Sequence, residues 1–220
     1  MSTSPPEVTD WSSYYRSVQP TARLTRRYTT REIKKALALH RLPAPGARIL
    51  EFGGANSCFL DAIVKQFHPS AYAVADTNEY GLSLLQGRAV NGCALSLHRD
   101  DVLAPASVAA LRFDLVFSVG LIEHFDPPNT ALAVRNHFRM VRPRGLVLLT
   151  FPCPTLLYRS TRAVLEKTRL WRFPDERALQ PAEVLNAIQG YGDVLFQKTL
   201  WPLMLTQHLV LVRARNESSE

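Results

Sequence analysis

Residues 48–57 read Arg48-Ile49-Leu50-Glu51-Phe52-Gly53-Gly54-Ala55-Asn56-Ser57, and this stretch decides the fold of the chain. A short apolar run of the kind that forms a buried strand ends in an acid and then enters a turn of small residues. The paired glycines have no Cβ, so the backbone can turn sharply there and a ligand can approach it closely. The stretch therefore predicts a strand that ends at a ligand-binding turn.

The acid in this stretch, Glu51, separates two classes of ligand. A dinucleotide-binding turn has the pattern G-x-G-x-x-G and places a pyrophosphate at a helix N-terminus. A carboxylate beside that position would repel a pyrophosphate, whereas it would attract a positively charged group such as the amine of a methionyl moiety. Small-residue turns also follow strands for purely structural reasons, so the turn alone leaves both a structural role and a cofactor site open.

Length and composition indicate one globular domain. The chain has 220 residues, of which 46% are hydrophobic, and no segment approaches the ~20 uninterrupted apolar residues that span a bilayer. Its first ten residues are polar and contain prolines, without the pattern of a signal peptide. The three cysteines, Cys58, Cys93 and Cys153, suit neither a disulfide framework nor a C-x-x-C metal knuckle. These features predict a cytoplasmic protein.

The net charge of +7 comes mainly from two segments. Residues 16–48 hold nine basic residues against the single acid Glu32, and residues 159–172 hold five against Glu166. Such clusters can attract phosphate, an anionic lipid surface or nucleic acid, or they can be solvated helix faces. Charge alone therefore leaves the partner open.

Strands and helices are expected to alternate between residues 28 and 151. The predicted strands are 48–52, 71–75, 94–98, 113–119 and 146–151, and the predicted helices are 28–42, 57–67, 79–90 and 129–140. This alternation predicts an α/β fold with a mostly parallel sheet and helices on both faces. From residue 152 the alternation stops, and helices at 156–171 and 181–189 precede strands at 194–200 and 208–213.

Two further motifs accompany the first stretch. One is Phe113-Asp114-Leu115-Val116-Phe117-Ser118-Val119-Gly120-Leu121-Ile122-Glu123-His124-Phe125, and the other is Met140-Val141-Arg142-Pro143-Arg144-Gly145-Leu146. Together the motifs resemble those of the class I S-adenosylmethionine-dependent methyltransferases, which commonly read acid-x-Gly-x-Gly-x-Gly, F-D-x-V-x-s…l-E-H and L-x-P-G-G. Ala55 and Ser57 replace the later glycines of the first motif.

The resemblance implies a Rossmann-like, doubly wound sheet of seven strands that closes with an antiparallel strand pair at its C-terminal end. It also implies S-adenosylmethionine as the cofactor. We expect a leader or lid at residues 1–27, a single methyltransferase domain at 28–215 and a disordered tail at 216–220. Within the domain, residues 152–181 would form an insertion on the substrate side.

The resemblance also implies where the cofactor binds. Asp76, 25 residues after Glu51 and followed by Thr77, would hold the ribose hydroxyls. Asp101, with the backbone of Val102, would contact the adenine edge, and Asp100 is the alternative. The other implied cofactor residues are Glu51, Gly53, Gly54, Ala55, Thr77, Ser118 and Gly120.

Glu123 and His124 are the catalytic candidates. An imidazole titrates near neutrality, so His124 could accept a proton from a hydroxyl group that attacks the cofactor methyl. Glu123 could orient the imidazole or bind a cation, or the pair could serve only to hold its loop. Similar pairs in ubiquinone-type O-methyltransferases follow another acid three residues earlier, and some of those enzymes use a divalent metal. Gly120 occupies that place here, so no metal is expected.

The acceptor is predicted only by class. A small molecule or saccharide that is methylated on oxygen is favoured, with a role in polysaccharide biosynthesis as one setting. The leader, with Trp11, Tyr14, Tyr15 and Arg16, and residues 152–181 would hold the acceptor. Within the latter, residues 155–176 mix aromatic residues with arginines and could hold a phosphate-bearing acceptor or lie on an anionic membrane at its inner face. The sequence pI of about 9.6 leaves a nucleic-acid methyltransferase as an alternative, although no Asn/Asp-Pro-Pro-Tyr/Phe tetrad is present. A non-catalytic binding protein that keeps the fold is the third possible function.

Overall fold

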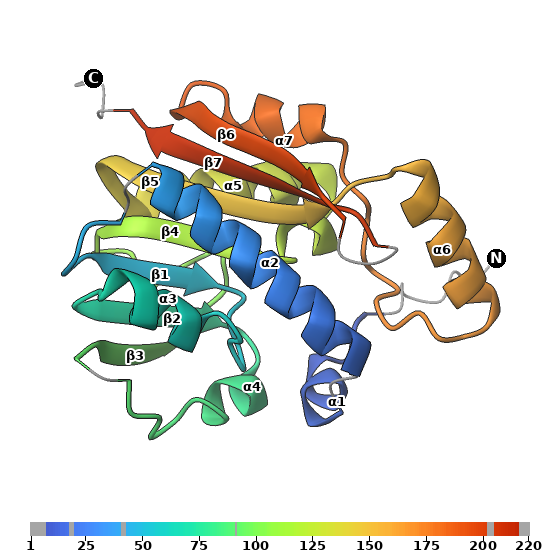
Figure 1. Cartoon of the computed structure of the whole chain (residues 1–220), viewed down its shortest axis with the longest axis horizontal. Coiled ribbons are helices and arrows are strands. Elements are labelled where there is room, and N and C mark those ends of the chain that lie inside the picture. Colours follow the sequence, from blue (N-terminus) through green and yellow to red (C-terminus); the bar gives the residue numbers. More distant parts are fainter. Residues whose placement is uncertain (1–7, 18–19, 41–42, 91, 202–204, 216–220) are drawn as a thin grey trace.

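The computed structural model describes residues 8–17, 20–40, 43–90, 92–201 and 205–215, so the tail predicted to be disordered lies outside the described residues. A seven-stranded sheet with helices on both faces forms the domain (Figure 1). Its strands are β1 (Arg48–Phe52), β2 (Ala71–Asp76), β3 (Ala94–Arg99), β4 (Phe113–Val119), β5 (Val141–Pro152), β6 (Gly192–Leu200) and β7 (Gln207–Ala214). The strand order is β3-β2-β1-β4-β5-β7-β6.

Strands β1 to β5 run parallel, while β7 is antiparallel to both β5 and β6. The predicted Rossmann-like fold, its seven strands and its antiparallel C-terminal pair are therefore confirmed. The chain runs outward from β1 to β3 and then returns to β4, so strand order reverses between β1 and β4. In sheets of this kind, ligands bind at the carboxyl ends of the strands, beside the point where strand order reverses.

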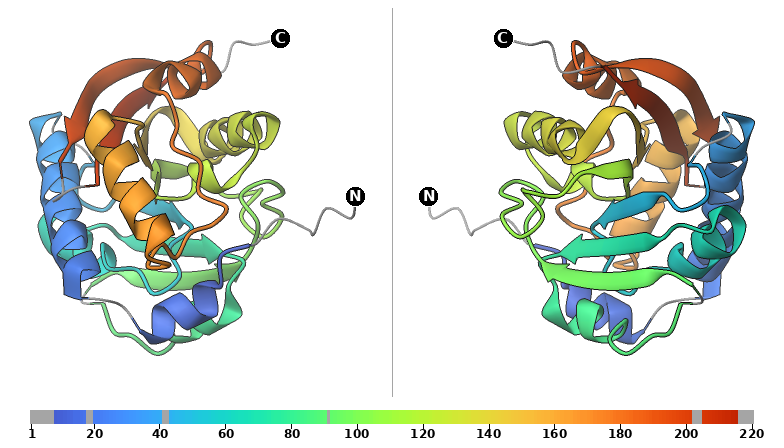
Figure 2. Two further views of the ribbon diagram at one scale, coloured as in Figure 1. Left: turned by 90° about the vertical axis from the view of Figure 1, so that its right-hand side faces the viewer. Right: turned by 90° about the vertical axis from the view of Figure 1, so that its left-hand side faces the viewer.

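The helices divide between the two faces of the sheet (Figure 2). They are α1 (Trp11–Arg16), α2 (Pro20–Leu39), α3 (Leu60–Phe67), α4 (Glu79–Ser83), the 3-10 helix η1 (Ile122–His124), α5 (Pro127–Met140), α6 (Leu156–Lys167) and α7 (Pro181–Ile188). The apolar faces of α2 and α3 pack on one side of the sheet, and those of α5 and α7 pack on the other. Because both faces are covered, the central strands are mostly apolar, although β1 carries Glu51 and β4 carries Asp114 and Ser118.

Several predicted element boundaries differ from those observed. The helix predicted from residue 28 begins at Pro20, because proline fits the first turn of a helix and the following basic residues form helices well. The helix predicted at residues 79–90 ends at Ser83, and the turns that follow include Gly87 with a φ of 73°. Helix α6 ends at Lys167, before the predicted residue 171.

The turn predicted at residues 142–145 lies inside β5 as a bulge. Phe113 pairs with Val141 whereas Leu115 pairs with Leu146, so the intervening residues of β5 loop out. A Cβ at Gly145 would lie 3.0 Å from a backbone carbonyl oxygen of β4, which explains the glycine. No helix among the described residues is both long and apolar enough to cross a membrane.

Candidate active site

Glu51 lies near the end of β1 with only 2% of its surface exposed. Its Oε2 accepts hydrogen bonds from the Ser57 hydroxyl at 2.7 Å and from the Tyr72 hydroxyl at 2.6 Å. Burial raises the pKa of Glu51 to about 7, although these two hydrogen bonds oppose the rise. The side chain is thus fixed in place, and its carboxylate would gain from a positively charged ligand.

The two glycines of the turn after β1 are required for different reasons. Gly53 has a φ of 68°, a conformation that side chains disfavour. At Gly54 the limit is space, because a Cβ would lie 2.7 Å from the Glu51 side chain and 3.0 Å from Val74. The turn therefore holds Glu51 by direct contact with the backbone.

Replacing Gly54 by alanine is expected to lower the free energy of unfolding by about 1–3 kcal/mol, because the added methyl group overpacks this buried site. Urea unfolding measures the effect. A matched control is Gly87→Ala, where a Cβ meets open space and only the positive φ is strained, at a cost of about 1 kcal/mol. An unchanged unfolding midpoint for Gly54→Ala would contradict the close contact.

Asp76 ends β2, the strand beside β1. Its Oδ2 accepts from the backbone N–H of Ala55 at 2.9 Å, and its Oδ1 accepts from that of Asn78 at 2.7 Å. Burial raises the pKa of Asp76 while these backbone hydrogen bonds lower it. The charge of Asp76 also raises the pKa of Glu51, so the two carboxylates influence the same region. Thr77 is exposed directly after Asp76.

The two acids after β3 are used differently. Asp100 is buried and accepts from the Ser107 hydroxyl and from the backbone N–H groups of residues 106–108. It therefore stabilises the following turn. Asp101 is exposed and accepts from the backbone N–H of Leu103, while Val102 beside it is buried. Of the two carboxylates predicted as adenine contacts, Asp101 is the accessible one.

Ser118 lies near the end of β4, and Gly120 follows the last residue of that strand. The Ser118 side chain is fully buried, and its hydroxyl lies 3.0 Å from His137 Nε2. Because His137 Nδ1 donates to the Ala133 carbonyl, Nε2 is the acceptor of this bond. Burial lowers the pKa of His137 to about 4, so its ring is neutral. The Ser118 hydroxyl is therefore turned toward α5, and only the backbone of this residue can face a cofactor.

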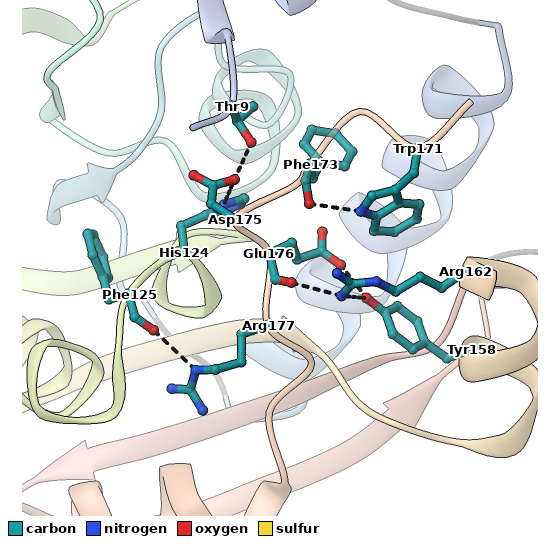
Figure 3. Close-up of polar contacts among 10 residues, drawn as sticks. All are labelled: Thr9, His124, Phe125, Tyr158, Arg162, Trp171, Phe173, Asp175, Glu176 and Arg177. Atoms are coloured by element: carbon teal, nitrogen blue, oxygen red, sulfur yellow. Dashed lines mark hydrogen bonds and ion pairs between the residues drawn. The ribbon is translucent and has the colours of Figure 1, made fainter. Parts of the chain in front are cut away.

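His124, at the end of η1, forms a pair with Asp175 (Figure 3). Its Nδ1 lies 3.1 Å from Asp175 Oδ1, and the Thr9 hydroxyl also donates to that carboxylate. Burial lowers the pKa of His124 while Asp175 opposes the effect. A neutral ring that donates from Nδ1 to a carboxylate keeps Nε2 as a proton acceptor. The pair thus has the chemistry of an oriented base.

A second acid lies beside this pair. Glu123 is buried, and its Oε2 has no hydrogen-bond partner within the described part of the chain. Burial raises its pKa well above the ordinary value, and the charges of Glu176 and Asp175 add to the rise. Glu176 accepts from the Tyr158 hydroxyl, and burial raises its pKa to about 7. Ligand atoms of Glu123, His124 and Glu176 lie within 4.8 Å of one another, so these groups could hold a metal ion. The absence of a metal stays a prediction.

Aromatic rings cover the imidazole. The ring of Trp11 in α1 lies 5.0 Å from that of His124, and the ring of Phe173 lies 5.7 Å from Trp11. Tyr14 packs edge-on against Phe173 at 5.2 Å. Residues from α1 and from the segment after α6 therefore form one aromatic wall next to His124.

Helix α1 also reaches the glycine turn after β1. A Cβ on Gly81 would lie 2.5 Å from Ala55 and 2.8 Å from the ring of Tyr15, which shows how closely the three residues pack. Burial raises the pKa of Tyr15, and the charges of Asp76 and Glu51 contribute to the rise. Helix α1 thus lies beside both the turn after β1 and the imidazole of His124.

Residues 22–188 match the methyltransferase domain family, which is more than half of the chain. The chain belongs to this family. The resemblance to class I methyltransferases that its motifs indicated is thereby confirmed. A comparison with curated proteins finds no match.

Solved methyltransferase structures share this fold at low sequence identity. The N-methyltransferase NodS from Bradyrhizobium japonicum, in complex with S-adenosyl-L-homocysteine, is 16% identical, with 91% of each chain covered and a TM-score of 0.64. Magnesium protoporphyrin IX methyltransferase from Synechocystis is 11% identical, with 93% of this chain and 92% of that chain covered and a TM-score of 0.72. The 1,6-didemethyltoxoflavin-N1-methyltransferase from Burkholderia thailandensis is 15% identical, with 94% of this chain and 86% of that chain covered and a TM-score of 0.68.

Proposed function

We propose that this protein is an S-adenosylmethionine-dependent methyltransferase that methylates a hydroxyl oxygen of a small-molecule acceptor. The observation that carries the proposal is the hydrogen bond between His124 and Asp175, at the sheet edge where β1 and β2 present Glu51 and Asp76. When bound, the cofactor supplies a methyl group that already carries a good leaving group. The protein therefore has to bind and orient the cofactor and the acceptor, and to remove a proton from the acceptor.

The residues at the strand ends suit this cofactor. Glu51 offers a carboxylate to its amine, Asp76 to its ribose and the exposed Asp101 to its adenine edge, while the turn at Gly53 and Gly54 lets it approach the backbone. Several similar structures were solved with S-adenosylhomocysteine, which supports the choice.

Calorimetric titration tests the cofactor. S-adenosylhomocysteine is expected to bind and NADH is not, because a carboxylate at Glu51 repels a pyrophosphate. Asp76→Ala should weaken binding at least tenfold, about 1.4 kcal/mol, because the ribose hydroxyls lose their acceptor. A matched control is Asp114→Ala, which changes an acid that accepts from the backbone of Arg48 at the start of β1. Tight binding of NADH would overturn the proposal.

The acceptor site favours a molecule with several hydroxyl groups, such as a saccharide. Asp175 holds the imidazole so that Nε2 of His124 can take the hydroxyl proton. The free oxygen of Glu123 and the carboxylate of Glu176 can accept from neighbouring hydroxyls. The aromatic wall can face the apolar side of a sugar ring. The basic residues at 159–172 would suit a phosphate on the acceptor, as in a nucleotide sugar.

Methylation of nitrogen is a second candidate, favoured by the same acids. Buried carboxylates attract an amine, and two of the similar structures carry the name of an N-methyltransferase. Incubation with methyl-labelled S-adenosylmethionine and matched sets of saccharides and amino sugars separates the two. We expect the label on oxygen; transfer only to nitrogen would replace the proposed acceptor atom. Salt-sensitive transfer to RNA or DNA would favour the nucleic-acid alternative.

A further inference from the structure

We propose that the outward face of α6 and the turn after it dock onto an anionic lipid bilayer. Large apolar side chains are exposed there, with exposed fractions of 85% for Leu156, 61% for Val164 and 62% for Leu170. Leu157 is exposed as well. These four belong to the eleven large hydrophobic residues found exposed among the described residues, and they fall within fifteen consecutive positions. Exposed apolar side chains gathered in this way mark an interaction surface.

The other face of helix α6 contacts the segment that follows the helix. The Tyr158 hydroxyl donates to the Glu176 carboxylate, and Arg162 donates to the Glu176 carbonyl at 2.8 Å (Figure 3). The Arg162 guanidinium also lies over the Trp171 ring, 5.1 Å from its centroid. The Trp171 indole in turn donates to the carbonyl of Phe173. The inner face is therefore well anchored, while Leu156 and Val164 point away from it.

The charge of this surface selects the partner. Residues 156–172 hold five basic residues and one acid. Arg162 pairs with that acid, Glu166, whereas no ion pair involves Arg159, Lys167 or Arg169 within the described part of the chain. Apolar side chains beside free cations fit a surface with lipid headgroups and acyl chains. Nucleic acid would leave the apolar side chains unused, and a second copy of this face would bring like charges together.

The position of α6 would bring a docked bilayer close to the candidate active site. It lies beyond the carboxyl ends of the parallel strands, at the same end of the molecule as α1 (Figures 1 and 2). The segment after it carries Asp175, the partner of His124. A bilayer against α6 would thus be next to the acceptor site. If the proposed function holds, the acceptor is a hydroxyl-bearing headgroup at the membrane surface.

Vesicle flotation tests the docking without any turnover. The full chain is mixed with vesicles of phosphatidylcholine alone or of phosphatidylcholine with phosphatidylglycerol. We expect binding to the anionic vesicles only, and weaker binding at high salt. The double variant Arg159→Gln, Lys167→Gln should lose about 25-fold in affinity, since each basic residue near an anionic surface contributes about fivefold. The double variant Leu156→Ser, Val164→Ser should also lose binding.

A control variant makes one change of each kind outside α6. Lys65→Gln with Leu84→Ser alters an exposed cation and an exposed leucine outside α6 and should bind vesicles like the wild type. Urea unfolding shows that each variant is folded, and binding of S-adenosylhomocysteine reports separately on the proposed function. Equal binding to neutral vesicles, or binding insensitive to the α6 variants, would overturn the docking. So would a dimer that Leu156→Ser dissociates.

Discussion

Replacing His124 by asparagine is expected to lower kcat by about 10²–10⁴-fold, the usual contribution of a general base. Asparagine keeps a donor for Asp175 but has no group that can take the acceptor proton. Steady-state kinetics with the acceptor identified by label transfer measures the loss. The control His98→Asn removes a histidine of β3 whose ring contacts only Ser96 and Ser107 among the polar groups described. It should leave kcat unchanged.

The pH dependence of kcat gives an independent check. Because burial lowers the pKa of His124, the wild type should lose activity only as the pH falls below the ordinary range of histidine. Asp175→Asn removes the charge that raises this pKa, so the acid limb should move to still lower pH while kcat falls. A kcat for His124→Asn within threefold of the wild type would exclude a base role for the imidazole and leave only its place in the loop.

Replacing Glu51 by glutamine is expected to stabilise the protein while weakening cofactor binding. The pKa of Glu51 is raised from 4.5 to about 7 in the folded state. Folding therefore favours the protonated form, and this contribution to stability is lost as the pH rises through about 7. At pH ~8 the buried carboxylate costs up to about 3 kcal/mol, the equivalent of a shift of about 2.5 pKa units.

Glutamine still accepts from Ser57 and Tyr72 but carries no charge. We therefore expect Glu51→Gln to raise the free energy of unfolding by about 1–3 kcal/mol at alkaline pH and by much less at acidic pH. Affinity for S-adenosylhomocysteine should fall more than tenfold. Urea unfolding and calorimetry measure the two effects. Glu32→Gln is the control of opposite sign, since a hydrogen bond from Lys198 lowers the pKa of Glu32. Loss of stability for Glu51→Gln at alkaline pH would refute the argument.

Most of the fold could be predicted from local sequence patterns. The apolar runs around Glu51 and Asp76 located β1 and β2, and the regular alternation of strands and helices implied their parallel order. Element ends were less predictable because they depend on tertiary contacts. The bulge in β5, for example, reflects the space that β4 leaves beside Gly145.

The candidate site was only partly readable, because its members come from distant parts of the chain. Asp175 lies 51 residues from His124, and Tyr72 lies 21 residues from Glu51. In the sequence, a tyrosine inside an apolar strand looks like a core residue. The hydrogen bond from its hydroxyl to Glu51 can be recognised only once the neighbouring strand is known. In the sequence, the one indication that Asp175 and Glu176 belong to the site is that they follow a segment rich in aromatic and basic residues.

The serine at position 57 changes how this turn should be compared with others. Where the usual pattern has glycine, the Ser57 hydroxyl donates to Glu51 and accepts from the backbone N–H groups of Phe59 and Leu60 at 3.2 Å. One side chain thereby both steadies the acid and starts α3. At this position the chain departs from the glycine-rich consensus by placing a side chain that forms three hydrogen bonds where the consensus has none. The number of glycines alone therefore underestimates how well such a turn is held.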